Sequence, residues 1–271
     1  MKDKIAAIHK LLSGWNRVLI ALSGGVDSAV LLKLTTDCLT PGNVLAVTIR
    51  SATATSAEMA MAAEIAGLCA VNHRFITTDE LAIPEFAANP VNRCYHCQRH
   101  RFGLLTGIAF TEGYEAVLDG SNESDQGDYR PGQLALRELG IRSPLKECAI
   151  NKEDIRQLAK QFLLPNRNRP ANACLASRLP YGTPVSKEAL NQIAAGEEVL
   201  RTAGFTQCRL RHHGNLARLE IFPEEFAGLL ETERRDTIIN SLKRLGYTYI
   251  TMDLQGYRTG SLNETLKEEL R

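Results

Sequence analysis

The stretch RVLIALSGGVDS, residues 17–28, decides the fold, because a β-rich run passes through a glycine turn into an apolar segment with helical spacing. Adjacent glycines let the backbone turn sharply and approach an anion closely. A helix that begins directly after them offers unpaired N–H groups and a partial positive charge. The stretch therefore predicts a phosphate-binding loop. Its residues are Ser23, Gly24, Gly25, Asp27 and Ser28, with Asp27 binding Mg²⁺ or fixing the loop.

Two other phosphate loops are excluded, since neither G-x-x-x-x-G-K-[ST] nor G-x-G-x-x-G occurs in the chain. An ordinary strand–helix turn capped by Asp27 is the alternative to a phosphate loop.

The first half of the chain alternates strand-like and helix-like segments, which predicts a mostly parallel, Rossmann-like α/β sheet with helices on both faces. The expected strands are 17–22, 43–49, 73–77 and 116–118, with a short fifth strand at 143–145. The expected helices are 28–39, 56–68 with Ser56 as N-cap, 98–112 and 151–162. Ligands of such sheets bind at the carboxyl ends of the strands, so the loops after Leu22, Ile49 and Leu118 are the candidate site.

The pattern changes in the second half. Residues 163–178 are rich in Pro, Asn and Arg and predict an irregular segment that reaches the active site. A helix at 186–203, strands at 207–211 and 216–221, a helix at 234–245 and a strand at 248–253 then predict a smaller α+β domain. We therefore expect an ATP-handling domain over 1–165, an active-site linker over 166–182 and a substrate or oligomerisation domain over 183–271.

The bulk composition limits the location and the partners. A formal net charge of +1 over 271 residues argues against a large nucleic-acid partner, whose phosphates would favour a basic excess. No apolar run reaches the roughly 18 residues that span a bilayer, and Met1–Lys4 do not begin a signal peptide. We expect a cytoplasmic protein with no membrane contact, and the seven cysteines as thiols or ligands.

Three of the cysteines stand out. Cys94 and Cys97 form a Cys-x-x-Cys expected immediately before a helix, and Cys174 lies in the irregular segment. The pair could be half of a zinc site completed by His96, His100 or Cys174, a redox pair, or two of three ligands of an iron–sulfur cluster. The other four are expected to be small buried hydrophobes, namely Cys38, Cys69, Cys148 and Cys208.

The string SGGVDS, residues 23–28, resembles the pyrophosphatase loop of the ATP-pyrophosphatase superfamily. Asp119 and Gly120, within the string DGSN at 119–122, fit the second nucleotide-facing loop of that superfamily. The resemblance implies that a substrate oxygen attacks the α-phosphate of ATP, pyrophosphate leaves, and a nitrogen or sulfur nucleophile captures the adenylated substrate.

A more specific resemblance comes from motifs in a fixed order. They are RCYHC at 93–97, GDYRPG at 127–132, CLASRLPYGT at 174–183, RLRHH at 209–213 and DLQGYRTG at 253–260. Together they resemble the LarE family, ATP-dependent sulfur transferases that build the nickel-pincer nucleotide cofactor. The resemblance implies a pyridinium dicarboxylate mononucleotide as substrate, adenylation of its carboxylate, conversion to a thiocarboxylate, and a homo-oligomer of trimeric or hexameric form.

The family has two sulfur sources. Some members sacrifice the sulfur of the cysteine at the Cys174 position, and others carry three cysteines and resemble cluster-dependent enzymes. This sequence has all three, so a 4Fe-4S cluster held by Cys94, Cys97 and Cys174 is the favoured expectation.

The substrate's phosphate and carboxylates call for forked cationic donors, which favours arginine. Arg209 and Arg211 alternate on an expected strand and so face the same side. Arg178 and Arg258 match further family positions, as does Glu197, which the resemblance places in the active site. The neighbouring His212 and His213 are equally compatible with the surface.

Three other functions fit parts of the sequence. An RNA-thiolating enzyme would share the loop and the cysteines, an ammonia-using amidating synthetase would leave the cysteines without a role, and a nucleotide-binding regulatory module would not turn over.

Overall fold

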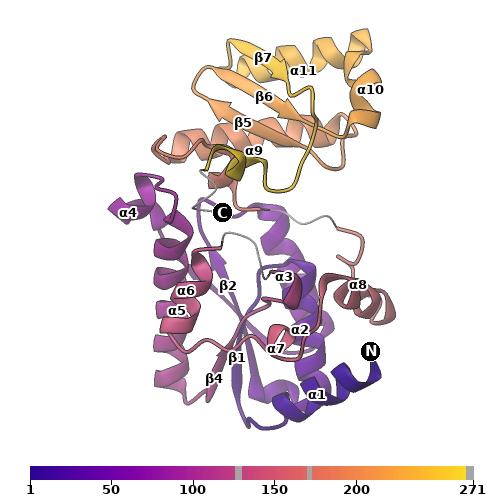
Figure 1. The fold of residues 1–271 in the computed structure, drawn as a ribbon. Coiled ribbons are helices and arrows are strands. Elements are labelled where there is room, and N and C mark those ends of the chain that lie inside the picture. Colours follow the sequence, from indigo (N-terminus) through magenta and orange to yellow (C-terminus); the bar gives the residue numbers. More distant parts are fainter. Residues whose placement is uncertain (126–129, 170–172, 267–271) are drawn as a thin grey trace. The chain divides into compact units, whose positions relative to one another are not determined.

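A computed structural model describes residues 1–125, 130–169 and 173–266, which form two compact units (Figure 1). The first unit comprises residues 1–80 and 92–172, and the second comprises residues 81–91 and 173–271. Gly127, Asp128 and Tyr129 of the GDYRPG motif lie outside the described residues.

The first unit is built on a parallel sheet of four strands in the order β3-β2-β1-β4. The strands are β1 (Val18–Ala21), β2 (Val44–Arg50), β3 (Asn72–Thr77) and β4 (Ala116–Leu118). Val18 lies opposite Val44 on one side and Ala116 on the other, so β1 is central. The expected parallel α/β sheet is confirmed.

Helices cover both faces of this sheet (Figure 1). They are α1 (Lys2–Leu12), α2 (Val26–Cys38), α3 (Ser56–Leu68), α5 (Arg93–Glu112), α6 (Gly132–Glu138), α7 (Pro144–Glu147) and α8 (Lys152–Gln161). The 3₁₀ turns are η1 (Pro41–Asn43), η2 (Glu80–Ala82), which continues into the second unit, and η3 (Glu123–Asp125). No helix among the described residues is long and apolar enough to cross a membrane.

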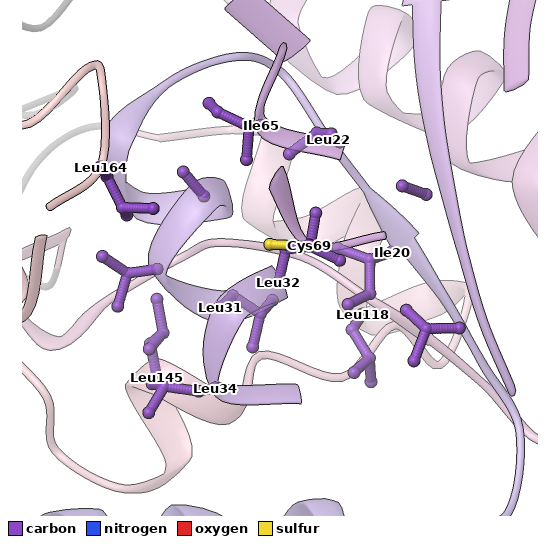
Figure 2. Close-up of a cluster of buried hydrophobic side chains, with 14 of the residues drawn as sticks. Ile20, Leu22, Leu31, Leu32, Leu34, Ile65, Cys69, Leu118, Leu145 and Leu164 are labelled. Carbon is purple, nitrogen blue, oxygen red and sulfur yellow. The ribbon is translucent and has the colours of Figure 1, made fainter. Parts of the chain in front are cut away.

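The larger core lies where α2 packs on the sheet. Figure 2 shows Leu31 and Leu34 of α2 among side chains from β1, α3 and α7, and Cys69 in the same cluster. On the other face, Phe102 and Leu105 of α5 pack against apolar residues of β1, β2 and β4. Burial of both faces explains why these strands are nearly continuous apolar runs.

The second unit contains a three-stranded sheet in the order β5-β6-β7, with β5 and β6 antiparallel and β6 and β7 parallel. The strands are β5 (Arg209–His213), β6 (Leu216–Glu220) and β7 (Tyr249–Met252). The helices are α4 (Pro84–Ala87), α9 (Lys187–Thr202), α10 (Phe226–Leu230) and α11 (Thr232–Arg244), with 3₁₀ turns η4 (Leu175–Arg178), η5 (Pro223–Glu225) and η6 (Ser261–Thr265).

The segment 81–91 belongs to this second unit although it precedes α5 in sequence. Asn89 is fully buried, and its Nδ2 donates to the carbonyl oxygens of Pro180 and Thr183 at 2.8 Å each. These bonds hold the segment to the LPYGT part of the Cys174 motif.

Three local expectations were wrong. Residues 143–145 are not a strand, because Ser143 precedes α7 and Pro144 occupies its first position, where proline's fixed φ suits a helix. The Cys-x-x-Cys lies inside α5, which begins at Arg93. The N-cap of α3 is Thr55, whose hydroxyl accepts from the Glu58 amide in a capping box.

Candidate active site

The strand order reverses between β1 and β4, since β2 and β3 extend the sheet on one side of β1 and β4 pairs on the other. Such a switch point opens a crevice at the carboxyl ends of the strands. The loop 23–25 follows β1 and the loop 119–122 follows β4. A Cβ added to Gly120 would lie 2.9 Å from the Ser28 amide nitrogen, so the loop 119–122 touches the first turn of α2 and only glycine fits there.

The two serine hydroxyls organise the loop after β1. Ser28 Oγ donates to the Gly25 carbonyl at 3.1 Å and accepts from the Ser23 amide at 3.2 Å. Ser23 Oγ lies 3.1 Å from Ser28 Oγ and accepts from the Gly25 amide at 3.3 Å. Because Ser28 uses its only proton on Gly25, Ser23 must be the donor between the two hydroxyls.

Gly24 is the strained point of the loop. Its φ is +78°, and an added Cβ would overlap the carbonyl oxygen of Glu58 in α3. Its own carbonyl accepts a 3.0 Å hydrogen bond from Nδ2 of the buried Asn166. That bond fixes the orientation of the Asn166 amide, whose buried Oδ1 has no hydrogen-bond partner among the residues that the structure describes. Two long-range contacts thus hold Gly24 in a left-handed conformation.

Asp27 makes a two-oxygen ion pair with Lys152 in the first turn of α8, at 2.5 and 2.7 Å. Burial raises the pKa of Asp27, and the Lys152 ammonium opposes that rise. Asp119 accepts from the hydroxyls of Ser121 and Ser143, and burial also raises its pKa. Both carboxylates therefore lie at the switch point, fixed by named partners.

Two residues of this site, Lys152 and Asn166, are not among those that the sequence predicted. A lysine in the first turn of a helix opposes the helix dipole, and this is the signal that marks Lys152. Asn166 carries no comparable signal, because its partner lies 142 residues away in the chain.

Cys94 and Cys97 are three residues apart at the start of α5, so both are on the same face of the helix. Cys94 is exposed and Cys97 is buried. A Cβ on Gly132 would lie 3.4 Å from the Cys94 carbonyl, which shows how closely α6 packs against this turn. His100 Nε2 lies 2.6 Å from the Thr78 hydroxyl.

Cys174 is exposed and immediately precedes η4 in the second unit. Among the described residues, no group of three or more His, Cys, Asp and Glu side chains is arranged to hold a metal.

The other four cysteines are free thiols, with Cys69 and Cys208 buried and Cys38 and Cys148 half-buried. Burial raises the pKa of each, and of Cys208 to about 12, so these thiols stay protonated.

The predicted arginines occur in three different environments. Arg178 is fully buried and pairs through both edge nitrogens with Glu197, and Arg211 does the same with Glu220. Arg258 pairs with Glu264 at 3.0 and 3.1 Å on the exposed side of the unit.

Arg209 lies beside these pairs, with its guanidinium 5.3 Å above the Tyr257 ring. Burial and the neighbouring charge of Arg178 lower the pKa of Arg209. Arg209 and Arg211 are two residues apart on β5, so both are on one face of the sheet, as expected.

The parallel sheet and the glycine-rich loop at its switch point define an ATP-using enzyme of the pyrophosphatase-loop superfamily, and an asparagine synthase family model matches residues 5–93. A Lactiplantibacillus plantarum protein named pyridinium-3,5-bisthiocarboxylic acid mononucleotide synthase is 36% identical over 98% of this chain and 96% of its own length. An uncharacterised Synechocystis sp. protein is 37% identical over 98% of this chain and 99% of its own length. The chain belongs to the LarE family of ATP-dependent sulfur transferases.

Proposed function

We propose that this enzyme adenylates a carboxylate of a pyridinium dicarboxylate mononucleotide and converts it into a thiocarboxylate. A carboxylate oxygen attacks the α-phosphorus of ATP, and pyrophosphate leaves. A sulfur nucleophile then attacks the acyl carbon, and AMP leaves with the carboxylate oxygen. The observation that carries the proposal is the 36% identity, over nearly the whole chain, to the synthase of a bisthiocarboxylic acid mononucleotide.

The first unit supplies the groups for adenylation. The amides at the start of α2 and the loop Ser23–Ser28 bind the phosphates, while Asp27 is the carboxylate that would hold Mg²⁺. Lys152, paired with Asp27 at 2.5 Å, orients that carboxylate and opposes the rise of its pKa on burial. Asp119 and Gly120 would complete the nucleotide site, since the close approach of Gly120 to Ser28 brings the second loop against the first.

Cys174 is the proposed centre of sulfur transfer, because it is exposed and immediately precedes the 3₁₀ turn η4. The donor set fits a cluster in its chemistry, with thiols of Cys94 and Cys97 on one helical turn and Cys174 exposed. These three residues would hold a 4Fe-4S cluster, which when bound supplies a sulfide at its open iron. The alternative is that Cys174 gives up its own sulfur and becomes dehydroalanine.

We propose Arg209 as the cation for an anionic group of the substrate. Burial and the charge of Arg178 both disfavour the charged form of Arg209, whose guanidinium lies over the Tyr257 ring. A phosphate or carboxylate bound beside this guanidinium would compensate both effects. Arg258 is paired with Glu264 in the structure. To bind the substrate, its guanidinium would have to release Glu264 and take the anionic group in its place.

The test combines three measurements on anaerobically prepared protein with ATP, Mg²⁺ and the pyridinium dicarboxylate mononucleotide. We expect substrate-dependent pyrophosphate release, a mass increase of the product by replacement of oxygen with sulfur, and iron with labile sulfide in the protein. Loss of one sulfur from Cys174 after turnover would select the sacrificial route. A mass change that shows amidation would contradict sulfur transfer.

The matched control for the cysteine roles is Cys148→Ala, a half-buried thiol outside the three-cysteine set. We expect it to retain thiocarboxylate formation, whereas Cys94→Ala/Cys97→Ala loses it together with iron. Full activity of that double variant without metal would exclude the cluster. We also propose that the protein is cytoplasmic and forms a homo-oligomer, a trimer or hexamer. Light scattering coupled to gel filtration measures the oligomeric state directly.

A further inference from the structure

Arg178 contacts the chain around Cys174 on one side and Glu197 on the other. Its Nη1 lies 2.6 Å from the Ala173 carbonyl oxygen and 3.2 Å from the Cys174 carbonyl oxygen. Its Nε and Nη2 donate to the two carboxylate oxygens of Glu197 at 2.7 and 3.1 Å. Arg178 and Glu197 are 0% and 1% exposed, so this pair is sealed from solvent.

Arg211 repeats the arrangement from β5. Its Nη1 donates to the Ser177 carbonyl at 2.7 Å, and its Nε and Nη2 donate to Glu220 at 2.9 and 2.8 Å. Glu220 is also fully buried. The two arginines therefore bind three carbonyls of the segment 173–178 that carries Cys174. Arg178 does so from the C-terminal end of the segment itself, and Arg211 from β5.

The glutamates are as fully used as the arginines. Glu197 Oε1 accepts from Arg178 and also from the Leu210 amide of β5 at 3.2 Å, which ties α9 to the sheet. A carboxylate that leaves such a pair would strand an uncompensated buried cation. A guanidinium that turned to a substrate anion would release both its glutamate and the turn. The two Arg–Glu pairs therefore hold the segment around Cys174 in place.

We propose that Arg178 and Arg211, each locked onto a buried glutamate, are positioning residues that hold the Cys174 turn and do not bind the substrate's anionic groups. Glu197 and Glu220 act in the same role, by fixing the two guanidinium planes. The inference rests on the proposed function, in which Cys174 acts in sulfur transfer. Other cations would then bind the substrate, and the two Arg–Glu pairs would fix the position of the Cys174 thiol.

The test compares Arg178→Lys with Arg235→Lys in the full-length protein. Lysine keeps the charge at 178 but cannot hold the glutamate and the carbonyls together. We expect kcat for thiocarboxylate formation to fall about tenfold or more, because small displacements of a reacting group cost that much. The KM for the pyridinium substrate should stay within about twofold, since only the turn and not the substrate loses a contact. Arg235, exposed on α11 and paired with the adjacent Asp236, is the matched control and should change neither value.

Hydrogen exchange provides a readout that does not depend on turnover. The Ser177 amide donates to the Cys174 carbonyl and the Leu179 amide to the Ala176 carbonyl, so both report the turn. In Arg178→Lys these amides should exchange about tenfold faster, while those of α11 stay unchanged.

Two outcomes would overturn the proposal. A rise in KM with unchanged exchange at Ser177 would show that Arg178 binds the substrate. Uniformly faster exchange throughout the second unit would show a general structural role. If the wild-type enzyme forms no thiocarboxylate, the proposed function fails, and the exchange at Ser177 and Leu179 still decides whether the arginine holds the turn. Arg211→Lys, read at Ser177, repeats the test in case Arg178→Lys does not fold.

Discussion

At the scale of single residues, Gly24 is the position where side-chain size matters most for ATP use. Its φ of +78° and the overlap of any Cβ with the Glu58 carbonyl exclude every other residue without backbone movement. We expect Gly24→Ala to cost about 1–3 kcal/mol of the free energy of unfolding. It should also raise the KM for ATP, because the displaced loop misdirects its amides. Urea unfolding and pyrophosphate release measure the two effects.

The matched control is Gly42→Ala, at a glycine with open space around it and no positive φ. We expect this variant to unfold and turn over like the wild type. ATP kinetics of Gly24→Ala that equal those of Gly42→Ala would remove Gly24 from the nucleotide loop.

The Lys152–Asp27 pair predicts a pH dependence. Replacing Lys152 by Met removes the charge that opposes the burial effect, so the pKa of Asp27 rises further above its ordinary value. A carboxyl whose pKa is higher in the folded state binds more protons when folded, so stability falls as the pH rises through that interval. We expect Lys152→Met to lose more stability near neutral pH than at about pH 3, where the carboxyl is largely protonated in both states.

The same substitution should move the acid limb of pyrophosphate release to higher pH, because the Mg²⁺ site proposed at Asp27 needs an ionised carboxylate. Lys160→Met, an exposed lysine on the same helix, is the control and should leave both profiles unchanged. An unchanged acid limb in Lys152→Met would show that Asp27 does not govern it. Urea unfolding across pH and initial rates provide the data.

At the scale of elements, the N-terminus of α8 sets the position of Lys152. Asn151 caps this helix through a 2.9 Å bond from the Asp154 amide, and Asp154 accepts from the Asn151 amide in return. We expect Asn151→Ala to cost about 1 kcal/mol of unfolding free energy and to raise the KM for ATP, because the first turn of α8 frays. Ser186→Ala removes the cap of α9 in the other unit and should cost a similar free energy without changing that KM. Equal ATP kinetics in the two variants would show that the cap of α8 does not influence ATP binding.

The sequence predicted those elements whose cause is local. The strands β1, β2 and β4 are buried apolar runs bounded by turns, and their patterns are legible without the partner strands. The start of α5 was missed because residues 93–97 have no apolar periodicity, and Pro144 should have indicated a helix start in place of a strand. The loop at 23–28 was predictable from its composition. Its contacts with Lys152 and Asn166 were not, since the partners lie 125 and 142 residues apart.

At the scale of the whole molecule, the proposed function divides the recognition of two ligands between the two units. The nucleotide loops lie in the first unit, and the arginine-rich face of the small sheet lies in the second. A ligand that binds only the folded state stabilises it by about 2.7 kcal/mol at one hundred times its Kd, and slows exchange where it binds. We expect ATP with Mg²⁺ alone to protect amides at 22–29 and 118–123, and to leave those of β5 unchanged. The pyridinium substrate alone should protect amides near Arg209 and leave the loop 23–28 unchanged. Protection of β5 by ATP alone, measured by hydrogen-exchange mass spectrometry, would contradict this division, because the only anion added would then bind the cations proposed for the substrate.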